Sequence, residues 1–236
     1  MFNDCLQGIR VLDLSQYIPG PFATQILADL GAEVLKVEPP GGDPMRSFML
    51  RDDDGLSPIY KQINAGKQLL ELDLKKPDHR ALFETLVAKA DVLLESYRPG
   101  VMERLGFSRE RLQQLNPRLV HCALSGFGQT GPARLRAGHD LTYLAMSGSL
   151  GISGTAETPA MAFAPVADHA GAMLATTAIL AALLRRGASN RGAYLDLSLF
   201  EATLFWQSIG LTAAQRPGQA LARGRDLLTG GAACYQ

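Results

Sequence analysis

Short apolar runs rich in Val, Ile and Leu alternate along the chain with segments long enough to form helices. Continuous apolar runs of this kind are typical of strands that are buried on both faces of a sheet. They predict strands over residues 8–14, 33–38, 68–74, 90–95, 118–124 and 193–197. Helices are expected over residues 21–30, 77–89, 168–186 and 199–214, with two short helices before residue 118. The alternation predicts an α/β fold, with a Rossmann-like parallel sheet covered by helices on both faces.

Two stretches depart from this alternation. The sequence PPGGDP at residues 39–44 ends the second strand, because proline lacks an amide donor and glycine favours turns. A polar excursion then runs to about Lys67, and residues 216–236 follow no strong period. We expect a large α/β domain over residues 1–215, and a linker over residues 216–236 that begins a second, smaller domain. Because that second domain would be largely absent, we expect the chain to be a fragment.

The charge balance bears on the kind of partner that the protein binds. The 236 residues include 23 basic and 23 acidic side chains, so no net field favours nucleic acid or an anionic membrane. The longest apolar run, over residues 170–184, is shorter than the roughly 18 residues that suggest a membrane span. We therefore expect a buried helix there, and a globular protein that binds neither nucleic acid nor membrane.

The cysteines indicate the compartment. Cys5, Cys122 and Cys234 are an odd number without a C-x-x-C pair, so they cannot form a closed disulfide framework. This usage fits a reducing cytoplasm, and residues 1–15 lack the basic and apolar segments of a signal peptide. The sequence suggests no zinc site and no other metal site.

The sequence GFGQTG at residues 126–131 matches the G-x-G-x-x-G pattern of dinucleotide-binding loops and follows a predicted strand. Such a loop opens a helix, and an acidic residue follows about 20 positions later. Here Pro132 follows directly, and residues 148–151 are Gly-Ser-Leu-Gly. The pattern therefore favours a tight turn near a ligand over a nicotinamide site.

Acidic side chains stand at the starts of two predicted helices. An Asp at the position of Asp168 commonly caps the free amides of a first helical turn, and that is the simpler explanation. The alternative is a carboxylate held where a substrate approaches the backbone closely. His139 and Asp140 likewise suit either a cap with a surface histidine or a proton-transfer group, because histidine titrates near neutrality. Arg46, Arg98 and Arg104 are candidate phosphate ligands, with the ring of Tyr97 as a surface for a purine.

A set of ordered motifs resembles the family III CoA-transferases and α-methylacyl-CoA racemases, also called the CaiB/BaiF type. The resemblance covers nearly the entire chain. The motifs are GIRVLD at residues 8–13, PGP at 19–21, LGAEV at 30–34, KVE at 36–38, LDLK at 72–75, YRPG at 97–100, RLG at 104–106, NPRL at 116–119, SGFGQTGP at 125–132, and the segment around Asp168.

The resemblance implies an α/β large domain that binds CoA thioesters, a small C-terminal domain, and a homodimer of two interlinked chains. It implies coenzyme A as part of the substrate and no prosthetic group. By position, Asp168 matches the essential carboxylate of the family and Arg98 matches a phosphate-binding arginine of the racemase branch. The residues that match the CoA-contacting group are Leu72, Ser96, Tyr97 and Arg104, with Ser96 standing where Asn is frequent.

Two chemistries share this scaffold. In the racemases one group removes the proton α to the thioester carbonyl and a second reprotonates the opposite face, with helix-start amides stabilising the enolate oxygen. In the transferases the carboxylate attacks the thioester, and CoA is later passed to a carboxylic acid acceptor. His139 stands where many transferases carry Tyr, so we favour racemase chemistry by His139 and Asp168. CoA transfer through Asp168 is the alternative, and a CoA-thioester-binding fragment without activity is the third.

Overall fold

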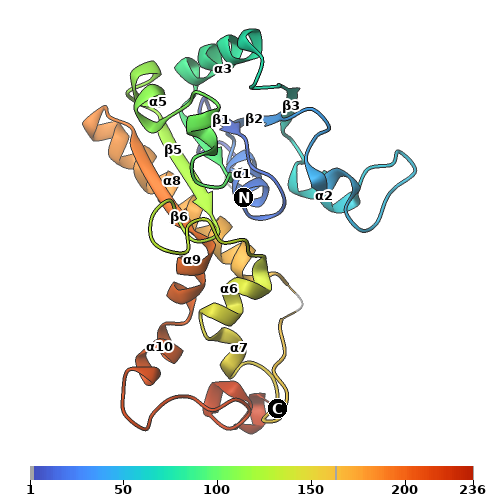
Figure 1. Ribbon diagram of the computed structural model, residues 1–236, viewed down its shortest axis with the longest axis vertical. Coiled ribbons are helices and arrows are strands. Elements are labelled where there is room, and N and C mark those ends of the chain that lie inside the picture. Colours follow the sequence, from blue (N-terminus) through green and yellow to red (C-terminus); the bar gives the residue numbers. More distant parts are fainter. Residues whose placement is uncertain (1–2, 163, 236) are drawn as a thin grey trace.

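The computed structural model describes residues 3–162 and 164–235, and its centre is a six-stranded parallel sheet (Figure 1). The strand order is β3-β2-β1-β4-β5-β6, and every neighbouring pair is parallel. The strands are β1 (Arg10–Asp13), β2 (Glu33–Glu38), β3 (Gln68–Glu71), β4 (Val92–Glu95), β5 (Val120–Ser125) and β6 (Ala193–Ser198). This doubly wound order confirms the predicted fold class. The order reverses between β1 and β4, which places a ligand crevice at the carboxyl ends of those two strands.

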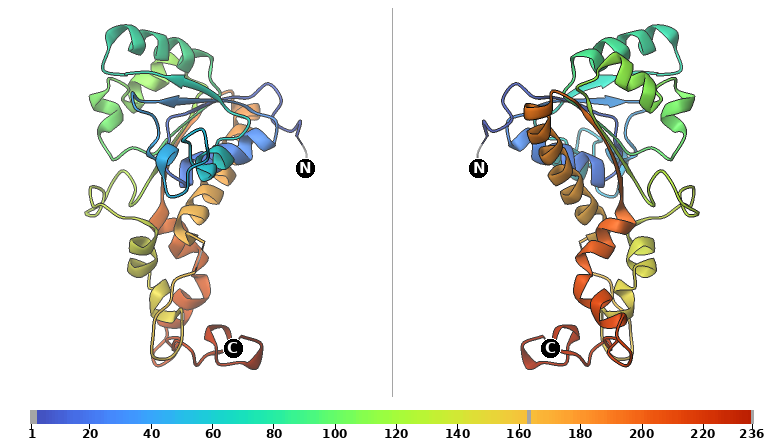
Figure 2. Two further views of the ribbon diagram at one scale, coloured as in Figure 1. Left: turned by 90° about the vertical axis from the view of Figure 1, so that its right-hand side faces the viewer. Right: turned by 90° about the vertical axis from the view of Figure 1, so that its left-hand side faces the viewer.

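Helices cover both faces of the sheet (Figure 2). One layer contains α1 (Pro19–Asp29) and α8 (Val166–Ser189), and the other contains α3 (Pro77–Lys89), α4 (Val101–Arg104) and α5 (Arg109–Leu115). Successive strand residues face opposite layers. Val11 and Leu94 belong to one buried hydrophobic cluster, whereas their neighbours Leu12 and Leu93 belong to the other.

The helix α8 crosses the protein as a core element. By length and composition its 24 residues could cross a membrane. One side of the helix is nevertheless buried against α1, α9 (Leu199–Trp206) and the sheet, and Ala167, Ala175 and Ile179 are fully covered. A Cβ on Gly171 would lie 2.2 Å from Leu199, so glycine is what permits this close packing. The expected apolar helix is therefore present, and it begins two residues earlier than expected.

Three local predictions need correction. The helix expected over residues 199–214 is two helices, α9 and α10 (Ser208–Ala214), which are separated at Gln207. The Pro-Gly-Pro sequence does not precede α1 but forms its first turn. The polar excursion contains a short 3-10 helix, η1 (Pro44–Ser47), and α2 (Pro58–Ile63), capped by the side chains of Asp43 and Ser57.

The remaining helices extend away from the carboxyl edge of the sheet (Figures 1 and 2). They are α6 (Asp140–Met146), α7 (Ser149–Ile152), α9 and α10, followed by the 3-10 turns η2 (Leu227–Thr229) and η3 (Ala233–Tyr235). Large apolar side chains on this extension are exposed, including Phe205, Trp206 and Ile209. The predicted domain boundary after residue 215 stays a prediction.

Candidate active site

Loops from several strands converge at the carboxyl edge of the sheet. The loop after β1 begins at Leu14, and the loop after β4 begins at Ser96. These two loops are joined directly, because the amide of Gln16 donates a hydrogen bond to Ser96 Oγ at 3.0 Å. At the point where the strand order reverses, the loops after β1 and β4 are therefore held together by a hydrogen bond.

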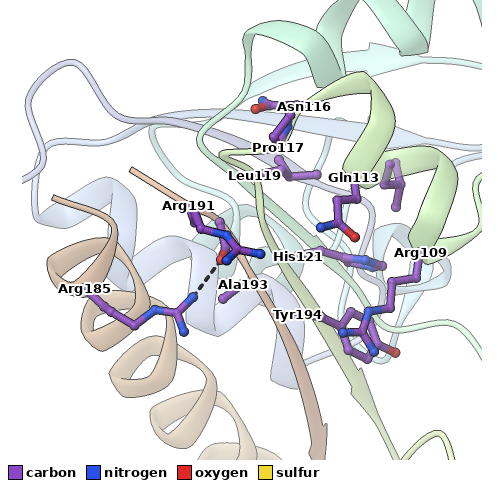
Figure 3. Close-up of a pocket in the computed structure, with 12 residues that line it drawn as sticks. Arg109, Gln113, Asn116, Pro117, Leu119, His121, Arg185, Arg191, Ala193 and Tyr194 are labelled. Atoms are coloured by element: carbon purple, nitrogen blue, oxygen red, sulfur yellow. Dashed lines mark hydrogen bonds between the residues drawn. The ribbon is translucent and has the colours of Figure 1, made fainter. Parts of the chain in front are cut away.

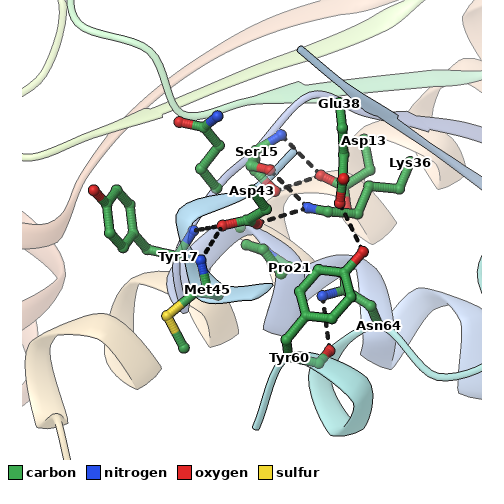
Figure 4. A network of polar contacts seen from close by, with 12 residues as sticks. Asp13, Ser15, Tyr17, Pro21, Lys36, Glu38, Asp43, Met45, Tyr60 and Asn64 are labelled. Atoms are coloured by element: carbon green, nitrogen blue, oxygen red, sulfur yellow. Dashed lines mark hydrogen bonds and ion pairs between the residues drawn. The ribbon is translucent and has the colours of Figure 1, made fainter. Parts of the chain in front are cut away.

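A buried polar network fixes the loop after β1 (Figure 4). The Asp13 carboxylate, at the end of β1, accepts hydrogen bonds from the hydroxyls of Ser15 and Thr24 and pairs with Lys67 Nζ at 3.1 Å. Lys36 Nζ donates to the carbonyl of Ser15 at 2.8 Å. Burial alone would raise the pKa of Asp13, but the two lysines and two hydroxyls outweigh it and lower the pKa to about 2.

The same network holds Tyr17 in an uncommon backbone conformation. Tyr17 has a φ of +62°, in the left-handed region that non-glycine residues rarely adopt. Its amide donates to Asp43 Oδ1 at 3.3 Å, and Asp43 Oδ2 pairs with Lys36 at 3.1 Å. The Tyr17 ring lies edge-to-face with the ring of His139, with 6.5 Å between centroids. The network therefore places an aromatic ring against one of the two predicted catalytic residues.

Asp168 does not cap α8, so the simpler sequence-based explanation of this residue is wrong. The N-cap is Pro165, and Asp168 is the third residue of the helix. The free amides of Ala167 and Asp168 instead donate to Asp140 Oδ1, at 2.6 and 3.1 Å. Within residues 3–162 and 164–235, no hydrogen bond reaches the Asp168 carboxylate. Its side chain is thus available for chemistry.

The surroundings of Asp168 tune its proton affinity. Burial, and then the negative charge of Asp140, raise the pKa of Asp168 to about 7, while His169 partly opposes them. The His169 ring lies edge-to-face with the ring of Phe22, with 5.0 Å between centroids, and its Nδ1 lies 2.7 Å from the Pro165 carbonyl oxygen. A carboxyl group that titrates near neutrality can accept and return a proton at physiological pH.

Tyr143 packs beneath this site between two glycines. Its hydroxyl donates to the carbonyl of Gly138 at 3.0 Å, and a Cβ on Gly126 would lie 2.4 Å from that hydroxyl. Burial and the charge of Asp168 raise the pKa of Tyr143 to about 12, and Arg98 opposes them. Gly126 therefore serves side-chain packing. Residues 126–131 form a bent loop with Gly128 and Gly131 at positive φ, not the hydrogen-bonded tight turn that was expected, and its place near a ligand stays a prediction.

The predicted CoA-contacting residues lie along the same edge. Leu72 follows β3 and is buried in the hydrophobic cluster against which Tyr97 packs. Ser96 is engaged by Gln16, whereas Arg98 and Arg104 are exposed and make no ion pair with a described carboxylate. The structure thus groups Ser96, Tyr97 and Arg98 on one loop, and their roles in CoA binding stay predictions.

Arg46 is not a free phosphate ligand. Its Nε donates to Glu38 Oε2 at 2.7 Å, and its guanidinium lies over the ring of Tyr60, 4.9 Å from the centroid. The side chain is therefore occupied by the buried network.

His139 and Asp168 come to the same edge without touching. Among the described residues, no hydrogen bond or ion pair joins the two side chains, and His139 is exposed. The link between them is Asp140, which follows His139 and binds the first turn of α8. Sequence reasoning missed both this link and the contact of Tyr17, because neither has a local signal. The described residues contain no cluster of three His, Cys, Asp or Glu side chains suited to a metal ion.

The effect of the Asp140 charge on the pKa of Asp168 can be tested separately from the role of Asp140 in capping α8. In Asp140→Asn, the amide oxygen still accepts the α8 amides, but the negative charge beside Asp168 is gone. The pKa of Asp168 should fall, so the rise of kcat/KM with pH should move to lower pH. A pH–rate profile of the full-length variant measures this shift, with the exposed Asp29→Asn as the matched control. A profile that coincides with that of the wild type would contradict the assignment.

The fold and the edge site together define a doubly wound α/β protein with a carboxyl group that accepts no described hydrogen bond near the carboxyl edge of its sheet. Within that class, the chain belongs to CoA-transferase family III, whose family model matches residues 6–236. It is 40% identical over 219 residues to acetyl-CoA:oxalate CoA-transferase of Acetobacter aceti, covering 92% of this chain and 56% of that protein. It is 39% identical over 237 residues to human α-methylacyl-CoA racemase, covering 98% of this chain and 57% of that protein.

A solved structure supports the same relationship. A CaiB/BaiF family protein from Brucella suis matches with a TM-score of 0.89 and 31% identity, over 94% of this chain and 60% of that one. The chain therefore spans somewhat more than half the length of the relatives that it matches. These comparisons confirm the family resemblance read from the motifs. The relatives are enzymes of CoA thioesters, and both transferases and racemases are among them.

Proposed function

We propose that the protein containing this chain transfers a proton at the carbon α to the thioester carbonyl of a 2-methylacyl-CoA, as a racemase does. The observation that carries the proposal is the Asp168 carboxyl group, which caps no helix and has a pKa of about 7. It lies next to Asp140, the residue that follows His139. A carboxyl group with a pKa of about 7 and an imidazole, a common general acid–base group, suit removal and return of one proton.

In this mechanism, one of the two groups removes the α-proton, and the electron pair moves onto the thioester oxygen to give an enolate. The other group then donates a proton to the opposite face. The α8 amides of Ala167 and Asp168 are taken by Asp140, so they are not free for the enolate oxygen.

The substrate's CoA moiety would lie along the loop after β4. Arg98 and Arg104 would bind phosphate groups, and Leu72, Ser96 and Tyr97 would line the nucleotide part. Coenzyme A enters as part of the substrate, and no prosthetic group takes part in these steps. We include in the proposal an interlinked homodimer of the whole protein, in which the exposed apolar side chains of α9 and α10 are covered.

CoA transfer between carboxylic acids is the second candidate. The Asp168 oxygens accept no described hydrogen bond, which leaves them free to attack a thioester carbon. CoA would leave as the acyl-aspartyl anhydride forms, and would later be passed to an acceptor acid. Several relatives carry the name of this activity, including a succinate–glutarate CoA-transferase of Agrobacterium fabrum that is 38% identical.

Deuterium exchange separates the two candidates. The full-length protein is incubated with 2-methylacyl-CoA thioesters in deuterated water, and NMR follows the α-hydrogen. We expect exchange, and we expect His139→Gln to slow it by about 10²-fold or more, the usual contribution of a general acid–base group. His79→Gln, which changes a histidine on α3, should leave kcat unchanged.

No exchange on any of several acyl chains would contradict the racemase proposal. Hydroxylamine trapping of an acyl group on Asp168, together with transfer that survives His139→Gln, would establish the second candidate instead. CoA binding without either reaction would leave the third reading, a binding protein without turnover.

A further inference from the structure

A cavity of about 310 Å³ lies on the α5 side of the sheet (Figure 3). Its lining comes from α5, from the first residues of β5 and β6 and the segments that lead into them, and from the end of α8. Asn116 and Arg191 stand just before the two strands, so the cavity lies toward their amino ends. The candidate active site lies at the opposite, carboxyl edge. The cavity therefore does not include Asp168 or His139, although a small pocket that shares Arg109, His121 and Tyr194 with it extends to Arg98.

Three arginines make this cavity electropositive. Arg185 and Arg191 enter from one side and Arg109 from the other (Figure 3). Arg109 is held by the ring of Tyr194, with its guanidinium carbon 4.5 Å from the centroid, and Arg185 donates to the Gly192 carbonyl at 2.7 Å. Among the described residues that line the cavity there is no Asp or Glu.

These arginines also lack ion-pair partners. Within residues 3–162 and 164–235, none of the three lies within 4.0 Å of a carboxylate. Two neighbours in the chain behave differently. Arg111 pairs with Glu84 at 2.8 Å, and Arg186 pairs with Asp91 at 2.9 Å. On α5 and α8, the arginines that line the cavity are thus the unpaired ones.

A buried histidine contributes a second, independent observation. His121 lines the cavity, and its side chain is 9% exposed. Neither of its ring nitrogens has a hydrogen-bond partner among the described residues, and Nε2 lies 3.9 Å from Glu95 Oε1. Leaving a buried polar group without a partner is costly. Both nitrogens are covered as the ring stands, so a ligand in the cavity would supply the missing partner by drawing the His121 ring toward it.

We propose that this cavity binds a small dianion, such as a phosphate group or a short dicarboxylate. The planar guanidinium group matches both chemistries, because it donates two parallel hydrogen bonds to carboxylate or phosphate oxygens. Arg109 on one side and Arg191 with Arg185 on the other would hold the two negative charges, and His121 would hydrogen-bond to the ligand. The volume is at the lower end of the range for small-molecule sites, which excludes a large polyanion.

The dianion site would contact the loop that we assign to CoA through one residue. Glu95 lies beside His121, and its Oε2 accepts the amide hydrogen of Tyr97 at 2.7 Å. Tyr97 and Arg98 follow directly on that loop. The binding proposal itself does not depend on the proposed activity, because no cavity residue takes part in the proton-transfer steps.

Isothermal titration calorimetry of the full-length protein tests the proposal with two probes, inorganic phosphate and succinate. We expect one site that survives saturation with CoA and the Asp168→Asn change, which separates it from the active site. Arg109→Gln and Arg191→Gln should each weaken binding by about tenfold or more, the effect of losing one charge-assisted bond. Arg111→Gln, on the same helix but paired with Glu84, is the matched control and should bind as the wild type does.

Binding of phosphate alone would identify a phosphoryl ligand, and binding of succinate alone a dicarboxylate. Either result supports the proposal if the two arginine variants weaken it. Absence of binding at millimolar concentrations of both probes would overturn the proposal. That result is also expected if residues outside this chain fill the cavity in the full-length protein, and the proposal fails in that case too. Binding that Arg109→Gln and Arg191→Gln leave unchanged, or that CoA abolishes, would also overturn it.

Discussion

Asp168→Asn is expected to lower kcat of the full-length protein by about 10³-fold or more, whichever of the two chemistries it performs. An amide cannot take the α-proton, and it cannot form the anhydride with an acyl group. The substitution keeps the size of the side chain and leaves the amide of residue 168 bonded to Asp140. The measurement is the initial rate with an acyl-CoA substrate, compared between the variant and the wild type.

Two further measurements make this result interpretable. The CoA dissociation constant should stay near that of the wild type, because Asp168 lies at the start of α8 and the assigned CoA loop follows β4. Asp29→Asn, at the exposed end of α1, should keep full activity. Turnover that survives Asp168→Asn would show that the carboxyl group has no chemical role, and both candidate functions would fail together.

The pH dependence of the wild type follows from the same carboxyl group. Because the pKa of Asp168 is raised to about 7, the active ionised form gains population as pH rises through neutrality. An ordinary aspartate would already be ionised near pH 4. Burial is the largest cause of this raised pKa, and the second cause, the charge of Asp140, comes from a residue 28 positions earlier in the chain. No local pattern in the sequence could have indicated it.

Elements whose ends are marked by glycine or proline in the neighbouring sequence could be predicted from the sequence. The strand at residues 33–38 and the helix at residues 77–89 match the structure at both ends, because a glycine turn precedes the first and Pro77 opens the second. The break at Gln207 could not be predicted, since the apolar pattern continues through it. There the Gln207 side chain donates to Ser147 Oγ at 3.0 Å, which is a tertiary contact.

Only some features of the candidate site could be predicted from the sequence. The family resemblance singled out Asp168, His139 and residues of the β4 loop, which the structure brings to one edge of the sheet, and their roles stay predictions. The capping role favoured for Asp168 was wrong, because Pro165 takes the N-cap position and a distant carboxylate satisfies the free amides. No helix was predicted inside the polar excursion, although Asp43-Pro44 and Ser57-Pro58 are pairs typical of a helix start. The Asp43 and Ser57 side chains cap the helices that begin there.

Asp13→Asn is expected to destabilise the protein by about 3–5 kcal/mol, the cost of removing one partner from a buried ion pair. Asp13 and Lys67 have fully buried side chains, and Lys36 shares their surroundings. Asparagine keeps the shape of the side chain, but it leaves two buried ammonium groups with the single charge of Asp43 nearby. The loop that carries Tyr17 depends on these contacts, so the variant should also lose order beside His139.

Chemical denaturation of the full-length variant measures this loss, and the control is Asp54→Asn, which removes one exposed partner of Lys61 and should leave the midpoint unchanged. The pH dependence gives a second test. The folded-state pKa of Asp13, about 2, lies below its ordinary value of 3.8, so its contribution is complete above pH 3.8 and is lost as pH falls through 2. The wild type should therefore lose stability in that acid range, and Asp13→Asn should lose less, because its side chain does not titrate. Equal midpoints for wild type and variant at pH 7 would show that the buried charges do not stabilise the fold.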